Sequence, residues 1–380
     1  MRRRPVAAGG AGRARYAAAR VGDVDLFSPL RLRTGASASN RIALAPMTNE
    51  QSHDDGTLGD EELAWLCSRA EGGFGTIITC AAHVTRDGQG WPGELGVFDD
   101  MHVPGLTRLA GALRERGALG LMQIFHGGVR ADAAVTGELP WGPSAAPGVR
   151  AATPADLERV IAAFAAAAAR VQRAGLPGVE IHGAHGYLLT QFLSREQNQR
   201  DDEYGGDLPG RARLLREVTR AVRAATDARF TVVVRLSPED FGNARGLDLD
   251  ESLQLARWLA DDGMDALHLS LWRAGLPTRK RPDTFAVPAF RAVLPADVAM
   301  FVAGAIWTRE EAEQQLARGA DAVAIGRAAI VNPRWPLQLR EPGFVPRRPP
   351  VTLAELRAMG LGPRFAQGMR RWKDFVREEP

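Results

Sequence analysis

Three side chains that can donate hydrogen bonds or protons follow one short apolar run. His182, His185 and Tyr187 come directly after Val179 and Ile181, whose spacing is typical of a buried strand. Parallel-sheet enzymes hold their reacting groups at strand ends of this kind. The two imidazoles are suited to donate hydrogen bonds to a substrate oxygen, and the phenol of Tyr187 is suited to supply a proton.

The His-x-x-His spacing of this motif has two other interpretations. The pair could be two ligands of a zinc site, or ordinary polar residues at the start of a helix. A metal site needs a third ligand and residues that orient the ligands. The chain has no His-Glu-x-x-His motif, and its two cysteines, Cys67 and Cys80, are not at ligand spacing. We therefore expect no metal at this motif.

The elements around the motif alternate between apolar runs and helical segments. Near-continuous apolar strands that alternate with helices indicate a parallel sheet buried on both faces. Eight such units predict an α/β fold, a (β/α)8 TIM barrel, with its active site at the carboxyl ends of the strands. A doubly wound sheet is the alternative, but no GxGxxG motif follows any strand. We expect strands at residues 42–45, 75–80, 118–124, 178–182, 230–236, 266–270, 300–303 and 322–325.

Three segments are expected along the chain. Residues 1–24 form an arginine-rich leader, for which we favour a disordered extension over a transit peptide. Residues 25–345 form the barrel, and residues 346–380 form a tail with one or two amphipathic helices that cover the barrel or a partner. Residues 127–149 carry glycine and proline throughout, so we expect a loop there without a strand.

Composition and charge exclude several classes of protein. At 45% hydrophobic and 24% charged residues the chain has an ordinary globular composition, and no apolar run approaches the roughly 20 residues of a membrane span. The formal net charge is +3, but residues 1–20 hold six arginines and no acid, which leaves about −3 for the remainder. That balance argues against nucleic acid as a partner. Two cysteines without a disulfide framework fit a reducing cytoplasm.

Other strand ends carry groups that suit a bound heterocycle and its phosphate. Gly304 and the pair Gly326-Arg327 suit a phosphate held by backbone N–H groups, although a glycine there could simply permit a tight turn. Arg235 needs an anionic or electron-rich partner, which a salt bridge or a ligand could provide. Gln123 offers an amide that both donates and accepts, which suits a heterocycle with alternating N–H and C=O groups.

Seven motifs in order give the chain a family resemblance. They are the stretch Asn40–Thr48, Gln123-x-x-His126-x-Gly128, the stretch Gly178–Leu188, Gln191-Phe192-Leu193-Ser194, Asp202-Glu203-Tyr204-Gly205-Gly206, Val234-Arg235-Leu236-Ser237 and Ala324-Ile325-Gly326-Arg327. With them the chain resembles the old yellow enzyme family of FMN-dependent ene-reductases from Asn40 to about Arg334. Glu50 departs from the pattern at a substrate-facing position that is often aromatic, and Val129 stands where many members have arginine.

The resemblance implies non-covalently bound FMN, NADH or NADPH as hydride donor, and a small enone-type substrate. NAD(P)H would reduce FMN and leave before an α,β-unsaturated carbonyl compound binds. His182 and His185 would bind the carbonyl oxygen, and Tyr187 would protonate the α-carbon. The residues expected to hold FMN are Ala45, Pro46, Met47, Thr48 and Ala81 along the flavin, Gln123 and Arg235 at its pyrimidine edge, and Gly304, Gly326 and Arg327 at its phosphate.

Two alternative functions are compatible with these motifs. One is a flavin-linked desaturase or dehydrogenase of a biosynthetic intermediate, and the other is a flavin-binding barrel without turnover. We expect a homo-oligomer and neither a nucleic acid nor a membrane as partner. A C-terminal arginine such as Arg364 or Arg370 is a candidate to reach the active site of a neighbouring subunit.

Overall fold

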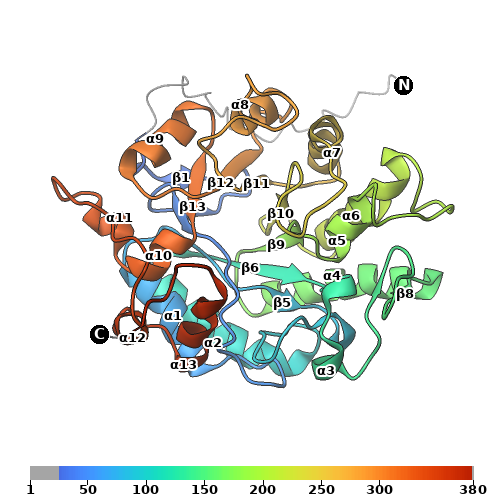
Figure 1. Cartoon of the computed structure of the whole chain (residues 1–380), viewed down its shortest axis with the longest axis horizontal. Coiled ribbons are helices and arrows are strands. Elements are labelled where there is room, and N and C mark those ends of the chain that lie inside the picture. The colour runs from blue at the N-terminus through green and yellow to red at the C-terminus, as the bar shows by residue number, and fades with distance from the viewer. Residues whose placement is uncertain (1–24, 379–380) are drawn as a thin grey trace, which may run out of the picture.

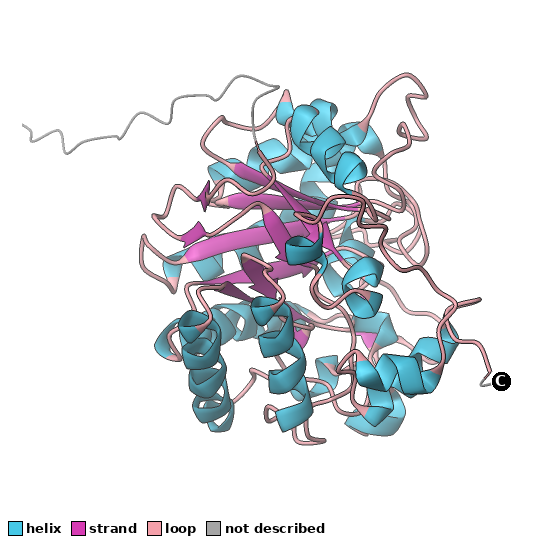
Figure 2. Ribbon diagram, turned by 90° about the vertical axis from the view of Figure 1, so that its left-hand side faces the viewer, coloured by secondary structure: helices cyan, strands magenta, loops and turns pink. Residues whose placement is uncertain are grey.

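The computed structural model describes residues 25–378, and its centre is a closed barrel of eight parallel strands. Each strand pairs with the next along the chain, and β13 pairs with β3, so the ring closes. Figure 2 shows the strands in the middle and helices around them. The predicted (β/α)8 barrel is confirmed. Its strands are β3 (Ile42–Leu44), β4 (Thr76–Ile78), β6 (Leu119–Phe125), β9 (Gly178–Gly183), β10 (Thr231–Leu236), β11 (Ala266–Ser270), β12 (Ala299–Ala303) and β13 (Ala322–Ile325).

Helices between successive strands cover the outside of the barrel (Figure 1). Local sequence defines where several of them begin. At the start of α4, the Thr153 hydroxyl accepts the Asp156 N–H at 3.2 Å while the Asp156 carboxylate accepts the Thr153 N–H at 2.9 Å. This capping box satisfies two amide groups that the helix itself leaves unbonded. The covering helices are α1 (Asp60–Glu71), α2 (Val103–Glu115), α4 (Pro154–Arg173), α6 (Leu208–Ala224), α7 (Leu249–Asp261), α8 (Ala286–Arg291) and α9 (Arg309–Ala317).

The strand register brings polar side chains together inside the barrel. Arg235 of β10 is paired with His182 of β9 and with His268 of β11. Gln123 of β6 is paired with Glu180 of β9. Because side chains alternate along a strand, Glu180 and His182 face the same side, and Glu180 lies one step further from the carboxyl end. All five residues are buried.

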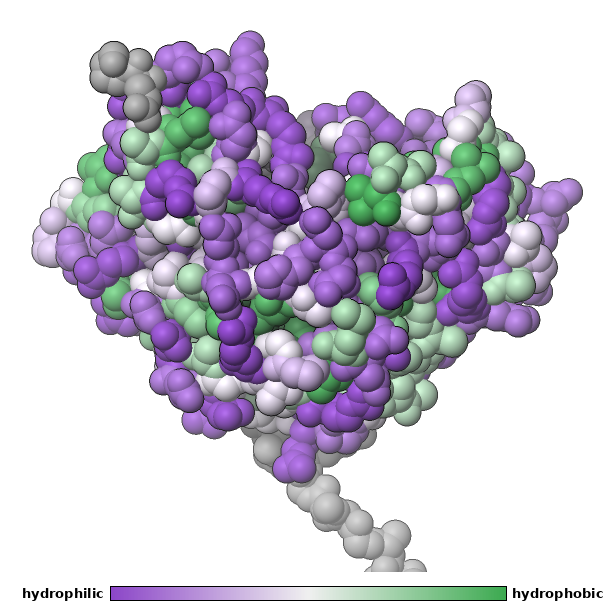
Figure 3. Space-filling view, turned by 90° about the horizontal axis from the view of Figure 1, so that it is seen from below, coloured by the Kyte–Doolittle hydropathy of each residue, from purple (hydrophilic) through white to green (hydrophobic). Residues whose placement is uncertain are grey.

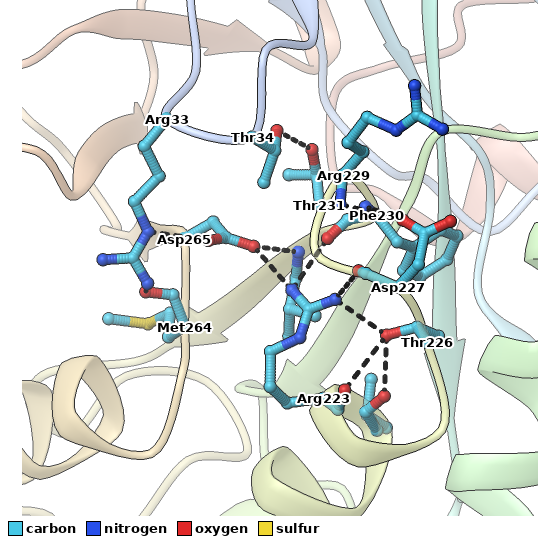
Figure 4. Close-up of polar contacts among 12 residues, drawn as sticks. Arg33, Thr34, Arg223, Thr226, Asp227, Arg229, Phe230, Thr231, Met264 and Asp265 are labelled. Carbon is cyan, nitrogen blue, oxygen red and sulfur yellow. Dashed lines mark hydrogen bonds and ion pairs between the residues drawn. The ribbon is translucent and has the colours of Figure 1, made fainter. Parts of the chain in front are cut away.

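The amino end of the barrel is closed by the hairpin of β1 (Leu30–Arg31) and β2 (Ser37–Ala38). Asp265, just before β11, accepts hydrogen bonds from Arg33 Nε at 2.7 Å and from Arg223 Nη1 at 3.2 Å (Figure 4). The hydroxyls of Thr34 and Thr231 are 2.8 Å apart. These contacts tie the hairpin to the starts of β10 and β11, which leaves the carboxyl end of the barrel for the site.

The segment between β6 and α4 is more ordered than a plain loop. It contains the short 3₁₀ helix η3 (Gly128–Arg130), α3 (Ala133–Thr136) and the paired two-residue strands β7 (Trp141–Gly142) and β8 (Arg150–Ala151). The prediction that residues 127–149 hold no strand is therefore wrong at β7. The physical reason is an anchored side chain, because the buried indole of Trp141 donates to the Asp87 carboxylate at 2.9 Å.

Several short elements follow strand ends directly. The strand β5 (Ala82–His83) pairs with β6 beside the barrel. The remaining short helices before the tail are α5 (Leu188–Leu193), α10 (Arg327–Val331), α11 (Trp335–Gln338) and the 3₁₀ turns η1 (Arg86–Gly88) and η2 (Asp100–His102).

The tail packs on the barrel through two helices, α12 (Leu353–Ala358) and α13 (Pro363–Gly368), and the 3₁₀ turn η4 (Met369–Arg371). In Figure 1 these helices lie beside α1. Phe365 of α13 is buried against Trp65 of α1, with ring centroids 5.0 Å apart and nearly perpendicular planes. Edge-to-face aromatic contacts of this kind stabilise packing by about 0.5–1.5 kcal/mol beyond the area they bury.

The predicted arginine-rich leader, residues 1–24, lies outside the described residues. Within residues 25–378, no helix is long and apolar enough to cross a membrane. On the face shown in Figure 3, hydrophobic side chains form small separate patches among hydrophilic ones. Scattered apolar side chains of this kind are normal for a globular surface.

Candidate active site

A cavity of about 790 Å³ lies at the carboxyl ends of the strands. This volume is within the usual range of about 300–1,000 Å³ for sites that bind small molecules. The residues that the sequence analysis assigns to catalysis or to FMN binding all line this one cavity, although the role of each stays a prediction. These residues are Ala45, Pro46, Met47, Thr48, Ala81, Gln123, His182, His185, Tyr187, Arg235, Gly304, Gly326 and Arg327.

Hydrogen bonds define which nitrogen of each histidine carries its proton. His182 Nδ1 accepts the Ala184 N–H at 3.3 Å, so we assign its proton to Nε2. His185 Nε2 is 2.6 Å from Ser270 Oγ, which itself accepts an N–H of Arg235 at 3.1 Å. We assign the Ser270 hydroxyl hydrogen to the bond with His185 Nε2, which places the His185 proton on Nδ1. Each ring keeps one N–H that these contacts do not use.

Both imidazoles are held in the neutral form. Burial lowers the pKa of His182 well below its usual value, and repulsion from a protonated His185 and from the charge of Arg235 would lower it further. Burial and Arg235 lower the pKa of His185 in the same way. The two rings lie 5.2 Å apart between centroids. The pair therefore supplies two uncharged N–H donors close together.

The phenol of Tyr187 lies beside the histidines with its proton retained. Its ring centroid is 5.1 Å from the rings of both His182 and Phe125. Burial raises the pKa of Tyr187, and the charge of Arg130 opposes this rise. The guanidinium of Arg130 stacks 4.2 Å from the centroid of the Tyr187 ring. A protonated phenol next to a cation is well suited to act as a general acid.

A tight turn between β9 and α5 holds this group in position. His185 and Gly186 have φ angles of 65° and 76°, in the left-handed region. The His185 N–H donates to Ser237 Oγ at 3.1 Å, and its carbonyl accepts from Arg130 Nη1 at 2.9 Å. A Cβ at Gly186 would lie 2.2 Å from the Asn243 carbonyl oxygen, so only glycine fits there.

The floor of the cavity fits the pyrimidine edge of a flavin. Arg235 Nε is buried without a hydrogen-bond partner among the described residues, so it is available for a ligand acceptor. Gln123 uses Nε2 to donate to Glu180 Oε1 at 2.7 Å, which leaves its amide oxygen for a ligand donor. An N–H donor beside an amide oxygen complements a ring edge that alternates C=O and N–H groups.

The two glycines expected at the phosphate differ in their surroundings. A Cβ at Gly326 would have Met47 Sδ at 3.7 Å as its nearest neighbour, so this position has open space toward the cavity. A Cβ at Gly304 would lie 2.7 Å from the backbone nitrogen of Ala274. Here glycine lets the loop after β12 approach the loop after β11. Arg327 is exposed at the rim, 6.0 Å from the ring of Trp272. Gly326 and Arg327 thus offer room and positive charge to a phosphate.

Several lining residues were not predicted from the sequence. Ser270 ends a predicted strand, but a single serine gives no chemical signal until His185 and Arg235 are seen on either side of it. Arg130 comes from a segment without a periodic pattern, and the amphipathic pattern of the tail does not show which part of the barrel it covers. The additional residues include Trp91, Arg130, Phe241, Ser270, Trp272, Phe365, Met369, Arg371 and Trp372.

Three other candidates lie away from the cavity. His126 is buried, lies 4.7 Å from Trp141 between ring centroids with the rings tilted, and accepts the Gly128 N–H through Nδ1 at 3.0 Å. Arg364 lies 3.4 Å from the Asp54 carboxylate, and Arg370 pairs with Glu378 at 2.7 Å. It is Arg371 that lines the cavity, in an ion pair of 2.6 Å with Glu50.

Comparisons with known proteins agree with this geometry. Residues 25–342 match the model of the NADH:flavin oxidoreductase / NADH oxidase family. The probable NADH-dependent flavin oxidoreductase YqiG of Bacillus subtilis (strain 168) is 35% identical over 333 residues, which cover 83% of this chain and 88% of that protein. The NADPH dehydrogenase of Bacillus licheniformis is 34% identical, with 82% of this chain and 92% of that protein covered.

Solved structures show the same likeness. The old yellow enzyme homologue from Zymomonas mobilis superposes with a TM-score of 0.75 at 29% identity, covering 85% of this chain and 94% of that one. Morphinone reductase superposes with a TM-score of 0.76 at 26% identity, covering 89% and 94%.

Proposed function

The chain belongs to the old yellow enzyme family of NADH:flavin oxidoreductases, which use FMN with NADH or NADPH as electron donor, and from this premise we propose that it reduces the C=C bond of α,β-unsaturated carbonyl compounds. The observation that carries the proposal is the convergence of two neutral imidazole donors and a protonated phenol on one cavity. The reduction of an enone requires hydrogen-bond donors to the carbonyl oxygen and an acid that protonates the α-carbon.

His182 and His185 bind the carbonyl oxygen of the substrate. As the β-carbon gains a hydride, negative charge grows on that oxygen, and donors fixed beforehand stabilise the charge. Removal of one such donor costs about 3 kcal/mol of transition-state stabilisation in comparable sites. Because Ser270 and the backbone of Ala184 hold the other nitrogens, neither ring has to change tautomer during the step.

Tyr187 gives its phenolic proton to the α-carbon. The hydride and the proton together add two hydrogens across the double bond, and NAD(P)H is oxidised to NAD(P)⁺. Arg130 stabilises the phenolate that remains until solvent returns a proton, because its guanidinium lies over the ring.

FMN supplies the hydride chemistry when it is bound. We assign its pyrimidine edge to Gln123 and Arg235, and its phosphate to Gly326 and Arg327 with Gly304 beside them. We assign its ring system to the stretch Ala45–Thr48 and Ala81. The unpartnered Arg235 Nε and the open space at Gly326 support these assignments.

An anaerobic spectral titration tests the proposed reaction. The visible flavin bands of the purified protein are expected to bleach with one equivalent of NADPH or NADH and to return when a cyclohexenone or a maleimide is added. A flavin that bleaches but stays reduced with both compounds contradicts ene-reduction. That outcome would favour the flavin-binding barrel without turnover.

The same anaerobic titration distinguishes ene-reduction from the desaturase alternative. A saturated ketone added anaerobically to the oxidised protein is expected to leave the flavin bands unchanged. Bleaching by the saturated ketone would show that the enzyme removes hydrogen from such compounds, and the proposed direction of the reaction would be wrong.

A further inference from the structure

One buried carboxylate lies beneath the cavity and has no place in the reaction described above. Glu180 of β9 is fully buried, one strand step below His182, and does not line the cavity. Its Oε1 accepts a hydrogen bond from Gln123 Nε2 at 2.7 Å. Its Oε2 lies 2.7 Å from His268 Nδ1. Burying a charged carboxylate costs free energy unless the charge is paired, so its partners must stabilise it.

The surroundings keep this carboxylate ionised. Burial alone would raise the pKa of Glu180, but His268, Arg235 and the Gln123 amide together lower it below its usual value. Burial lowers the pKa of His268, so this imidazole is neutral and donates to the carboxylate through Nδ1. Glu180 in turn opposes the lowering of the Arg235 pKa by burial. Glu180 is therefore a buried counter-charge to Arg235.

We propose that Glu180 is a positioning residue that sets how strongly the site favours reduced over oxidised FMN. One carboxylate oxygen fixes the amide of Gln123, so that its Nε2 points away from the cavity and its oxygen remains for the cofactor. The negative charge offsets part of the Arg235 field at the same floor. The inference rests on the proposed contact of Gln123 and Arg235 with the pyrimidine edge.

The electrostatic consequence has a definite sign. Reduced flavin carries more negative charge on its pyrimidine edge than oxidised flavin, so Arg235 favours the reduced form and Glu180 opposes this preference. Removing the negative charge should tighten binding of reduced FMN relative to oxidised FMN. For a two-electron couple, a tenfold change in this ratio corresponds to about 30 mV in midpoint potential.

The Glu180→Gln variant tests the proposal on the FMN-loaded protein. The amide can still accept from Gln123 and can donate to His268 after that ring changes tautomer, so shape is kept and charge is lost. We expect the midpoint potential of bound FMN, measured by equilibration with a reference dye, to rise by about 30 mV or more, the equivalent of a tenfold change in the affinity ratio. A potential equal to that of the unsubstituted protein overturns the proposal.

Two further variants separate charge from packing. Glu180→Asp keeps the charge and should restore a potential close to the original, which a purely structural role for the side chain does not predict. Glu62→Gln makes the same change at another fully buried carboxyl, one that accepts from Ser52 and lies on α1 outside the cavity. It should leave the potential unchanged, and an equal rise in both glutamine variants would also overturn the proposal.

His268→Leu covers the case in which Glu180→Gln does not fold. Loss of this donor leaves the carboxylate with fewer partners, so it holds its negative charge less readily and the potential should again rise. An unchanged or lowered potential in His268→Leu contradicts the proposal. None of these measurements uses an enone, so a failure of the proposed ene-reduction would leave them interpretable. Absence of bound FMN in the unsubstituted protein would overturn both.

Discussion

At the scale of single residues, the site works by holding groups in fixed protonation states. His182 and His185 are neutral because they are buried next to Arg235, and Tyr187 keeps its proton because it is buried too. The field of Arg235 thus acts twice, at the cavity floor and on the histidine pair. The hydroxyl of Ser270 connects these two places, since it accepts from Arg235 and faces His185 Nε2.

The rate of alkene reduction should therefore be nearly independent of pH across a wide range. The pKa of both histidines lies below the ordinary 6.5, so neither ring gains a proton as the pH falls toward that value. The pKa of Tyr187 lies above the ordinary 10.0, so the acid is lost only at still higher pH. Stopped-flow reoxidation of the reduced flavin by an enone measures this profile. A rate that declines as the pH rises through 6.5 would instead mean that an imidazolium is the donor.

Substitution of Tyr187 by phenylalanine should separate the two half-reactions. Loss of a positioned general acid typically costs 10²- to 10⁴-fold, so we expect flavin reoxidation by the enone to slow by about that factor. Reduction of the flavin by NADPH needs no proton from this phenol and should keep its rate. Both rates are measured by stopped-flow absorbance.

Tyr204→Phe is the matched control for this variant. Its phenol donates to Glu217 at 2.8 Å and lies outside the cavity, so both half-reactions should be unchanged. If Tyr187→Phe slowed both half-reactions equally, the assignment of Tyr187 as the proton donor would have to be abandoned.

At the scale of elements, the turn between β9 and α5 converts a strand end into a site. Residues with φ in the left-handed region at His185 and Gly186 reverse the chain, so that His182, His185 and Tyr187 face one cavity. Backbone strain of about 1–3 kcal/mol at a non-glycine residue persists only where the surroundings impose it. Here Ser237 and Arg130 bond both ends of the His185 backbone unit.

Gly186→Ala should disrupt this turn. A Cβ in the left-handed region costs about 1–2 kcal/mol, and the clash with the Asn243 carbonyl adds about 1–3 kcal/mol. The melting temperature and the rate of enone reduction should both fall. Gly137→Ala is the control, because Gly137 has a similar φ of 70° but no atom within 4 Å of the added Cβ. Equal losses of stability in the two variants would contradict the steric argument.

The strands could be predicted from the sequence because each is a short buried run bounded by glycine, proline or charged residues. Helices α5 and α10 could not be predicted. They have no side-chain cap, and they begin within site motifs that lack the apolar periodicity of a helix. The strand β7 is held by the contact between Trp141 and Asp87, residues far apart in sequence. Contacts of that kind leave no local pattern.

At the scale of the whole molecule, the cavity wall is assembled from remote parts of the chain. Strand ends supply its floor, the segment after β6 supplies Arg130, and the tail supplies Phe365, Met369 and Trp372. The floor could be predicted because barrel geometry gathers all strand ends at one face. The contribution of the tail could not, because contacts between residues far apart in sequence, such as Phe365 with Trp65 and Arg371 with Glu50, bring it to the cavity.

Two tail substitutions should separate stability from substrate binding. Phe365 is 3% exposed, so Phe365→Ala should lower the free energy of unfolding by about 3–5 kcal/mol. Trp372 is 53% exposed at the cavity, so Trp372→Ala should change stability by no more than about 0.5 kcal/mol while raising KM for bulky enones. Thermal denaturation and steady-state kinetics measure the two effects. If KM were unchanged for every enone in Trp372→Ala, the predicted contribution of this tail residue to substrate binding would be wrong.

The position of Trp372 at the cavity also makes the chain easy to label chemically. Only two lysines occur in the sequence, Lys280 and Lys373, and both are exposed. Lys280 forms ion pairs with Asp248 and Asp250, whereas Lys373 directly follows Trp372. Besides the α-amino group, an amine-reactive fluorophore therefore has one lysine next to a residue that lines the cavity and one in the loop after β11. We expect the emission of a dye on Lys373 to change when a ligand enters the cavity, without any engineered cysteine.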